Sequence, residues 1–257
     1  MTHAPPSGSP VPSGTTVPSG STVPSGTTMP SGDLVDVWWL DTRAGTTGPV
    51  GLADLSQGER DRAEAFLFPA DRHRYQVTHL MLRRLLAGYT GTPPSTLRLA
   101  REPCPHCGAP GKPVLEPGPR PVPSFSLTHS GDMVIIAVAG RPVGVDVERD
   151  AAGCVCSLAQ ALHPADAAWV AGLDEPDRHE AIITCWVRAE AVLKCTGQGI
   201  GHGLGGFPAR PGGAAGSAAN GCTVRQLPAP DGYRAAVALA GTRPPVLRAP
   251  GGGPGGG

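Results

Sequence analysis

Three runs of strand-forming residues, separated by very short connections, lie in the middle of the sequence and constrain the fold more than any other feature. Phe125–His129 alternates apolar with polar residues, Met133–Ala139 is apolar throughout, and Val143–Glu148 carries a valine at every second position. Ser130-Gly131-Asp132 and Arg141-Pro142 separate the runs. These patterns predict consecutive strands, with Met133–Ala139 central and forming a hairpin with Val143–Glu148.

The segments on either side of these strands add helices and further strands. Leu34–Leu40 reads as a strand, and the pattern from Leu55 to about Tyr89 predicts helix, with Pro69 beginning a second helix. Further along, we expect a short strand at 96–100, a proline-rich loop at 101–123, helices at 158–173 and 176–196, a glycine-rich loop at 197–221, and strands at 222–227 and 233–239. This order predicts an α+β fold with mixed or antiparallel sheets rather than regular βαβ units.

Glycine and proline gather at the two ends of the chain, where they account for much of the 37 glycines and 30 prolines among 257 residues. Residues 1–32 repeat units such as VPSGTT. So little apolar surface cannot offset the entropy of ordering, and we expect this tail to be disordered. The Pro/Gly-rich residues 241–257 are expected to be a second disordered tail.

The charge and cysteine patterns exclude several classes of protein. Lys plus Arg equals Asp plus Glu at 21 each, so no net field attracts nucleic acid or an anionic membrane. The longest apolar run is too short to span a bilayer. The sequence opens without the basic and apolar segments of a signal peptide, and its seven cysteines are irregularly spaced. These features favour a cytoplasmic protein with reduced thiols.

Two carboxylates share one face of the predicted strand 143–148. Asp146 and Glu148 lie on one side, and Val145 and Val147 lie on the other. Two residues along a strand advance the backbone by roughly 6.6 Å, so both acids can reach one cation. Oxygen ligands select a hard ion, Mg²⁺ or Mn²⁺. On these residues alone, two solvated acids on a half-exposed strand are the simpler interpretation.

A second motif adds a carboxylate and a cation. CWVRAEAVLKCTG places Trp186, Glu190 and Lys194 four residues apart, on one helix face. This face predicts a metal–phosphate site, with an ordinary surface Glu–Lys pair as the alternative. His129 ends a strand at a turn, which fits either a phosphate donor or a turn cap.

Taken in order, GKP, SFSLTHSG, VGVDVE and WVRAEAVLK resemble the 4′-phosphopantetheinyl transferases of the surfactin-synthetase-activating type, over roughly residues 34–240. The resemblance implies a pseudo-two-fold arrangement of two similar α/β halves, here 33–140 and 141–240, with the site between them. It also implies transfer of the 4′-phosphopantetheine arm of coenzyme A to a serine of an apo acyl- or peptidyl-carrier protein, with release of 3′,5′-ADP. A monomer is expected, because both halves lie in one chain.

The resemblance also assigns roles to individual residues. It implies that Asp146, Glu148 and Glu190 hold Mg²⁺, with Mn²⁺ possible, and that Glu190 is also the base for the incoming serine. It implies that Lys194 contacts a coenzyme A phosphate and that His129 binds the 3′-phosphate. The remaining implied contacts to the nucleotide are Lys112 and Pro113 along it, Arg83 near the 3′-phosphate, and Arg62 as a further positive charge.

The sequence departs from the family pattern at three positions. Ala189 stands where a lysine usually precedes the helix glutamate, and Arg188 points roughly 100° further round the helix. Ser126 and Thr128 replace the usual asparagine and serine of the histidine motif. We expect that lysine at 189 lowers the apparent KM for coenzyme A.

The cysteine motifs and a glycine-rich segment can each be interpreted in more than one way. CPHC at 104–107 looks like half a zinc site that Cys154 and Cys156 would have to complete. GQGIGHGLGG at 197–206 lacks the lysine of a phosphate loop and is interpreted as a flexible segment beside the site. Two alternatives to an enzyme follow: Ala189 suggests a catalytically silent carrier-protein or nucleotide-binding module, and CPHC suggests a zinc-ribbon adaptor. Candidates for a basic carrier-docking surface are Arg72, Arg74, Arg83 and Arg84.

Overall fold

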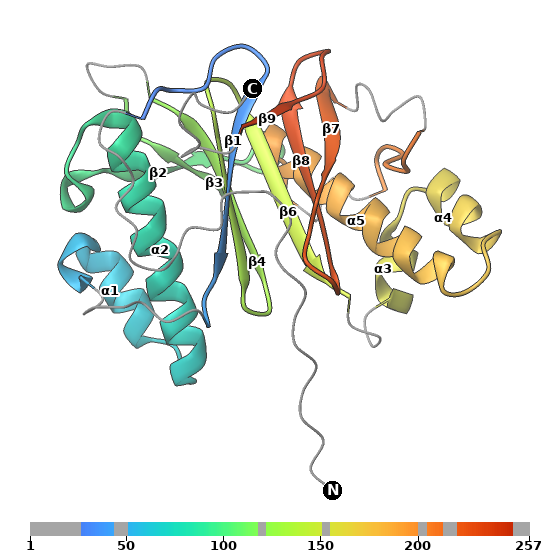
Figure 1. The fold of residues 1–257 in the computed structure, drawn as a ribbon, viewed down its shortest axis with the longest axis horizontal. Coiled ribbons are helices and arrows are strands. Elements are labelled where there is room, and N and C mark those ends of the chain that lie inside the picture. The colour runs from blue at the N-terminus through green and yellow to red at the C-terminus, as the bar shows by residue number, and fades with distance from the viewer. Residues whose placement is uncertain are drawn as a thin grey trace, which may run out of the picture.

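The computed structural model describes residues 27–43, 51–117, 122–150, 155–199, 205–212 and 220–248. The expected tail at 1–32 lies mostly outside these residues, as does the end of the chain after 248. The elements form two sheets that pack against each other, and a long helix covers the outer face of each sheet (Figure 1). Among the described residues, no helix combines the length and the hydropathy needed to cross a lipid bilayer.

The first sheet has the strand order β4-β5-β1-β9. Its strands are β1 (Leu34–Asp41), β4 (Ser124–Ser130), β5 (Met133–Ala139) and β9 (Val246–Arg248). Strand β5 pairs antiparallel with both β4 and β1, and β9 pairs parallel with β1. Every residue of β5 is buried, which agrees with its apolar sequence and its central place.

Two helices lie on the outer side of this sheet. Helix α1 (Gln57–Glu64) begins at Ser56, whose hydroxyl and backbone amide form a capping box with Glu59. Helix α2 (Pro69–Thr90) begins at a proline and ends at Gly91 in the left-handed conformation. Its apolar face packs on Trp38, Leu40 and alternate residues of β5. Short 3₁₀ helices, Leu52–Asp54 and Pro94–Thr96, flank this pair.

The second sheet has the strand order β6-β8-β7. Its strands are β6 (Val143–Arg149), β7 (Cys222–Leu227) and β8 (Tyr233–Ala240), all antiparallel. Helix α5 (Asp177–Thr196) covers its outer face and packs on Ala236 and Ala238. Helices α3 (Val155–Ala161) and α4 (Pro164–Ala171) lie beyond α5 (Figure 1).

The inner faces of the two sheets form one shared apolar core. Val35, Val37 and Trp39 of β1 lie in the same cluster as Val143, Val145 and Val147 of β6, together with residues of β5 and β8. The molecule is therefore built in four layers: helix, sheet, sheet, helix. The α+β prediction is confirmed, and the alternation of valines in Val143–Glu148 is explained by this shared core.

The predicted hairpin between Met133–Ala139 and Val143–Glu148 is wrong. Both edges of β5 are already occupied, by β1 and by β4. No edge is left for β6, so the chain crosses at Arg141-Pro142 into the other sheet, where β6 pairs with β8. The valines of β6 still contact β5, but through side chains of the shared core rather than through backbone hydrogen bonds.

Three further expectations need correction. Residues 101–123 are not only a loop, because β2 (Leu99–Pro103) and β3 (Pro110–Leu115) form a separate two-stranded hairpin there. The predicted helix 158–173 is divided in two at Pro164. The tail from 241 is not wholly loose, since β9 joins the first sheet.

Candidate active site

Helix α5 lies directly against strand β6 because residue 144 is glycine. A Cβ atom at Gly144 would stand 2.0 Å from the carbonyl oxygen of Ala191 and 2.3 Å from the amide nitrogen of Cys195. Only a glycine leaves room for the helix and the strand to meet backbone to backbone. This contact fixes α5 so that Lys194 reaches Asp146 on β6.

Three hydroxyl groups of β4 attach strand β6 to the first sheet. Ser126, Thr128 and Ser130 are two residues apart and therefore share one face of β4, and we call them the hydroxyl row. The Ser126 Oγ accepts from the Val145 amide at 3.1 Å. The Ser130 Oγ donates to Glu148 Oε2 at 2.9 Å and accepts from the Arg149 amide at 3.0 Å. The hydroxyl row thus holds the acidic strand where no backbone ladder exists.

Asp146 is almost fully buried at 3% exposed. Its Oδ1 accepts hydrogen bonds from Lys194 Nζ at 2.6 Å and from Thr128 Oγ1 at 3.0 Å. Its Oδ2 is buried and has no hydrogen-bond partner. Burial raises the pKa of Asp146, whereas Lys194 and Thr128 oppose this rise.

Glu190 has even fewer partners than Asp146. It is buried, and its Oε1 has no hydrogen-bond partner. Burial, followed by the negative charges of Asp146 and Glu148, raises the pKa of Glu190 to about 7, against the opposing effect of Lys194. Burial also raises the pKa of Glu148. The three carboxylates are therefore close enough to repel one another, and one lysine offsets them in part.

The three predicted metal ligands are not gathered around a single point. Among the described residues, no group of three or more His, Cys, Asp or Glu side chains is arranged to hold a metal ion. The cation beside Asp146 is the Lys194 ammonium. The residues nevertheless fit a divalent ion by donor type, because Asp146 Oδ2 and Glu190 Oε1 are the buried, unpartnered carboxylate oxygens of the described residues.

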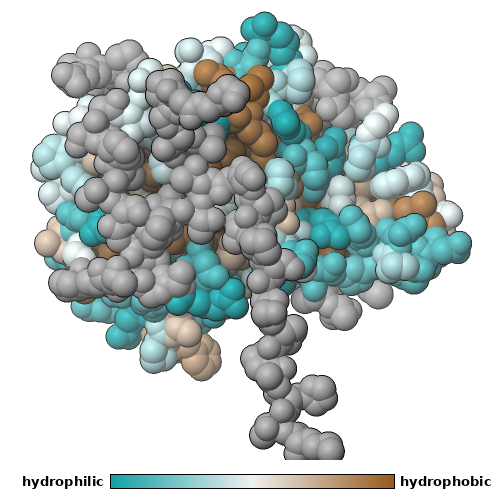
Figure 2. Space-filling model, viewed as in Figure 1, coloured by the Kyte–Doolittle hydropathy of each residue, from teal (hydrophilic) through white to brown (hydrophobic). Residues whose placement is uncertain are grey.

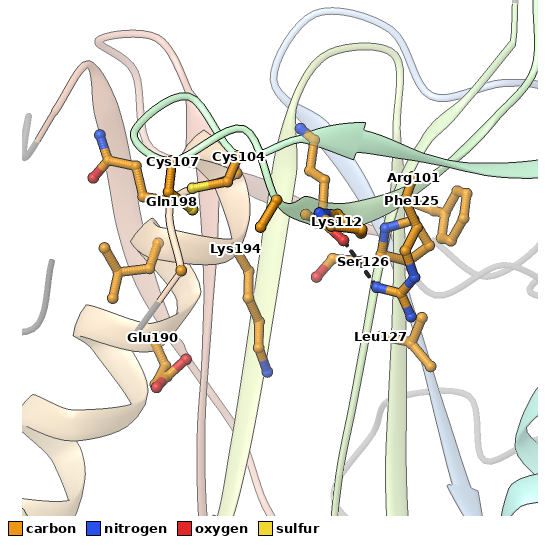
Figure 3. Close-up of a pocket in the computed structure, with 17 residues that line it drawn as sticks. Arg101, Cys104, Cys107, Lys112, Phe125, Ser126, Leu127, Glu190, Lys194 and Gln198 are labelled. Carbon is orange, nitrogen blue, oxygen red and sulfur yellow. Dashed lines mark hydrogen bonds between the residues drawn. The ribbon is translucent and has the colours of Figure 1, made fainter. Parts of the chain in front are cut away.

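A pocket of about 440 Å³ opens between the β2–β3 hairpin, strand β4 and helix α5. Figure 3 shows Glu190 and Lys194 lining it from helix α5 and Lys112 lining it from strand β3. Pro113 also lines the pocket. The Lys112 Nζ donates to the Cys195 carbonyl at 3.3 Å, which ties the hairpin to the end of α5. Five predicted site residues therefore form two adjoining groups. Asp146 and Glu190 lie near Lys194, and Lys112 and Pro113 lie on strand β3 across the pocket.

His129 lies beyond Lys194, at the end of β4. It lines a neighbouring pocket of about 370 Å³ together with Lys194, Pro113 and Arg101. His129 is exposed, yet surrounding protein atoms lower its pKa, and the positive charges of Lys194 and Arg74 lower it further. The first pocket also contains Arg101, Pro113 and Lys194, so the two pockets adjoin.

The structure does not support the role suggested for Arg83. This residue is 2% exposed, and its Nε donates to Glu59 Oε2 at 2.6 Å. Its Nη1 donates to the carbonyl groups of Pro94 and Leu97 at 2.7 and 3.1 Å. A guanidinium held in this way stabilises the N-terminal half and lines neither pocket described above.

The other arginines proposed for binding are placed differently. Arg62 is exposed over the ring of Phe66, at 5.6 Å from its centroid. Arg74 pairs with Asp71 and Asp132, and Arg84 pairs with Asp54. Arg83 is buried and is removed from the proposed docking surface, and acidic neighbours offset the charge of Arg74 and Arg84. Arg72 is exposed and donates to the carbonyls of Glu64 and Phe66.

The zinc motif and the glycine-rich segment fall partly outside the described residues. Cys104 and Cys107 are free thiols at the tip of the β2–β3 hairpin. Cys154 and residues 200–204 lie outside the described residues, and the side chain of Cys156 is not described. Since no third ligand joins the two thiols among the described residues, a closed zinc site is not found there.

Sequence reasoning missed two contributors to the site. Arg101 of β2 lines both pockets and donates from Nη1 to the Gly111 carbonyl at 2.8 Å. The signal was hidden because 101–123 was interpreted as a loop. Ser130 was assigned only to a turn, although its two-residue spacing from Thr128 places both on the face towards Asp146 and Glu148.

Comparison with known proteins assigns both halves of the chain to one superfamily. A model of the 4′-phosphopantetheinyl transferase superfamily matches residues 142–228. A second model, of the N-terminal part of a 4′-phosphopantetheinyl transferase, matches residues 50–141. The two matches adjoin at the passage from β5 to β6 and together cover most of the described chain.

Relatives with assigned names agree with these matches. The chain is 33% identical over 160 residues to the 4′-phosphopantetheinyl transferase psf-1 of Bacillus pumilus, which covers 61% of this chain and 64% of that protein. It is 31% identical over 154 residues to the 4′-phosphopantetheinyl transferase HetI of Nostoc sp., over 58% of this chain and 62% of the relative. The chain thus spans a little less than two thirds of the length of these relatives. By the two matches and by these relatives, it belongs to the 4′-phosphopantetheinyl transferase superfamily.

Proposed function

We propose that this protein transfers the 4′-phosphopantetheine arm of coenzyme A to a serine of an apo acyl- or peptidyl-carrier protein, releases 3′,5′-ADP, and requires Mg²⁺ or Mn²⁺. One observation carries the proposal: two buried carboxylate oxygens, on Asp146 and Glu190, have no partner in a site whose pocket is lined by Lys112 and Lys194. Such oxygens are costly unless a cation accompanies the ligand.

The acids are the proposed ligands of the ion. Asp146, Glu148 and Glu190 supply only oxygen, the donor that Mg²⁺ prefers. When bound, the ion draws negative charge from a diphosphate and so favours attack at phosphorus. The raised pKa values of the three acids support this assignment. Burial is their main cause, and repulsion from neighbouring carboxylates adds to it for Glu148 and Glu190, so a bound cation would favour the charged forms.

The basic residues are proposed to bind and orient coenzyme A. Lys194 lies on the wall common to both pockets and donates to a phosphate oxygen of the ligand. His129 is the proposed ligand of the 3′-phosphate, and Lys112 and Pro113 are the proposed contacts along the nucleotide. Arg101 lines both pockets and adds a guanidinium that takes the place of Arg83 in this proposal.

Glu190 is the proposed acceptor of the proton that leaves the attacking serine. It borders the larger pocket, and its Oε1 has no hydrogen-bond partner and can accept a proton from a hydroxyl that enters there. Ala189, the residue before it, is buried in the apolar cluster of α5, and this apolar environment disfavours a cation at position 189. This position is the reason to keep a silent binding module as the alternative function.

The decisive experiment is an intact-mass assay with coenzyme A, Mg²⁺ and a panel of apo carrier proteins. Transfer adds about 340 Da to the carrier, the mass of the group moved in this phosphoryl-transfer chemistry. Asp146→Asn and Glu190→Gln are expected to lower the rate at least about 10³-fold. Glu64→Gln, which neutralises an exposed acid of α1, is the matched control and should leave the rate unchanged.

The outcomes separate the candidates. Addition that disappears in both site variants supports the transferase. Binding of coenzyme A without addition to any carrier would favour the silent module. Equal rates in wild type and Glu190→Gln would contradict the roles given to the acids. We also propose that the protein is cytoplasmic, which agrees with the free thiols among the described cysteines. We propose that it is a monomer, which light scattering would check.

A further inference from the structure

Two cysteines at the tip of the β2–β3 hairpin lie outside the machinery proposed for transfer. Cys104 and Cys107 are separated by two residues, and both border the larger pocket. Figure 3 shows their sulfur atoms beside one another, at the same end of the pocket as Gln198. Cys107 is exposed, whereas Cys104 is 7% exposed. An outside reagent can therefore reach Cys107 directly and Cys104 through the pocket that both residues line.

The local backbone holds the two thiols in a tight turn. The Cys104 amide donates to the Ala109 carbonyl at 2.7 Å, and the Gly108 amide donates to the Cys104 carbonyl at 2.9 Å. Gly108 has a φ angle of +71°, which closes the turn. On the other strand, a Cβ atom at Gly111 would stand 2.8 Å from the Glu102 carbonyl oxygen, so the hairpin is narrow. The turn thereby keeps Cys107 within hydrogen-bonding reach of the Cys104 sulfur.

The surroundings of Cys104 favour its thiolate. Backbone amides of His106, Cys107 and Gly199 donate to its sulfur, and the Cys107 thiol adds a further hydrogen bond. These contacts lower the pKa of Cys104 to about 7, so a large fraction is thiolate at neutral pH. By contrast, burial raises the pKa of Cys185 to about 12. Cys104 is therefore an activated thiol beside an exposed second thiol. Cys222, whose pKa is also lowered, lies beside Cys195, but both thiols of that pair are buried.

Two thiols without further ligands do not form a structural zinc site. Structural zinc takes four ligands, and no third His, Cys, Asp or Glu joins these two among the described residues. An activated thiolate with an adjacent resolving thiol is instead the arrangement that thiol–disulfide exchange requires. We propose that Cys104 and Cys107 are a reversible modification site, in which low-molecular-weight disulfides oxidise the pair to an intramolecular disulfide.

The reaction balances as two exchange steps. The Cys104 thiolate attacks one sulfur of a disulfide R–S–S–R, forms Cys104–S–S–R and releases one thiolate RS⁻. The Cys107 thiol loses its proton to solvent, and its thiolate attacks the Cys104 sulfur and releases the second RS⁻. The protein loses two electrons and two protons as thiols, and the small disulfide is reduced to two thiols. A small dithiol reverses both steps.

The disulfide would change how the hairpin is held. In the reduced protein the Cys104 sulfur accepts from the Gly199 amide, just beyond α5, and Lys112 donates to Cys195 within α5. Oxidation replaces an anionic acceptor by a neutral one and weakens the first of these two links. The modification therefore acts on the wall of the pocket rather than on the acids of the site.

The test uses the full chain in a Cys154→Ser, Cys156→Ser background, so that these two thiols cannot react. The reduced protein is incubated with glutathione disulfide, quenched with an alkylating reagent and measured by intact mass. Two alkylation sites are expected to disappear together, with a loss of about 2 Da before alkylation and full recovery with dithiothreitol. Peptide mapping should place the bond between Cys104 and Cys107.

Two variants assign the roles within the pair. With Cys107→Ser, Cys104 should stop at the mixed disulfide, a gain of about 305 Da for the glutathione adduct. With Cys104→Ser, the rate of modification should fall at least about tenfold at pH 7. Cys185→Ser is the matched control, and it should leave the exchange unchanged. All readouts are masses, so they do not depend on transferase activity.

Three results would overturn the proposal. The first is survival of both thiols in excess glutathione disulfide. The second is an equal rate in Cys104→Ser and wild type. The third is one equivalent of zinc in the purified protein by elemental analysis, because a metal would already occupy both sulfurs.

Discussion

The two halves of this molecule have the same plan, yet they treat a buried glutamate in opposite ways. In the N-terminal half, Glu59 is 8% exposed, and hydrogen bonds from His79, Ser56 and Arg83 outweigh the effect of burial and hold its pKa at about 2. In the C-terminal half, Glu190 is 4% exposed, has an unpartnered oxygen, and has a pKa raised to about 7. The first acid completes the fold, and the second lacks a counterpart within the described chain.

Glu59 and Glu190 differ in whether the protein itself supplies hydrogen-bond donors to the buried carboxylate. A buried carboxylate with a full set of donors contributes to stability, and removing either partner leaves the other uncompensated. A buried carboxylate without donors costs stability until something outside the chain neutralises it. The same residue type in two comparable layers is therefore a structural support in one half and belongs to the proposed binding site in the other.

The largest expected change in stability comes from the supported acid. Glu59→Gln should lower the free energy of unfolding by about 3–5 kcal/mol, because it leaves the Arg83 guanidinium buried without its counter-charge. Chemical denaturation at pH 7 measures this loss. Glu59→Gln combined with Arg83→Met should recover part of it. A change below about 1 kcal/mol would mean that the comparison fails on the N-terminal side.

The pH dependence of stability should distinguish the two glutamates. For Glu190, the pKa rises from 4.5 to about 7 on folding, so between these pH values the folded state binds more protons than the unfolded state. Stability should therefore fall as pH rises through this window, by up to about 3 kcal/mol. For Glu59, whose pKa falls from 4.5 to about 2, stability should be present above pH 4.5 and be lost as pH falls towards 2.

The measurement is a set of denaturation curves from pH 2 to pH 8 for wild type and two variants. Glu190→Gln should reduce the decline between pH 4.5 and 7, leaving the contributions of Asp146 and Glu148, and Glu59→Gln should reduce the loss below pH 4.5. Added Mg²⁺ should reduce the decline in stability between pH 4.5 and 7 in wild type, and should have a smaller effect on Glu190→Gln, which lacks one of the three proposed ligands. Identical profiles for wild type and Glu190→Gln would contradict the raised pKa and the contrast built on it.

The smallest expected effect concerns Ala189, next to Glu190. A lysine at position 189 should lower the apparent KM for coenzyme A by roughly two- to fivefold. The effect is small because the lysine side chain must extend out of an apolar cluster before its ammonium group can reach a phosphate. Steady-state kinetics by carrier mass shift provides the value. Ala189→Gln has a similar length without charge and is the control. An unchanged or raised KM with lysine would speak against a missing phosphate contact at this position.

Much of the fold was predictable where local pattern decides structure. The apolar run of β5, the proline at the start of α2 and the spacing of Glu190 and Lys194 on α5 all correspond to elements of the structure. Strand partners were not predictable in this way. Pairing of β6 depends on which edges of β5 remain free, and that is decided by β1, almost a hundred residues earlier.

The site shows the same limit. Side-chain spacing placed Glu190 and Lys194 on one helix face, but only Gly144, which lets α5 touch β6, brings Lys194 to Asp146. Arg83 and Arg84 are neighbours in the sequence, and no local signal states that Arg83 would meet Glu59, 24 residues earlier, in the core. Within the site, the long-range partner of Arg83 was therefore not predictable from local sequence.

Strand β9 has a consequence for the order of events during synthesis. Asp36 on β1 is fully buried, and its counter-charge is Arg248, which donates from Nε at 2.6 Å and from Nη2 at 2.8 Å. The ribosome delivers Asp36 more than two hundred residues before that guanidinium emerges. Until then the β1 edge of the first sheet is open and the Asp36 carboxylate lacks its counter-charge, so this sheet is completed only when residues 246–248 have been made.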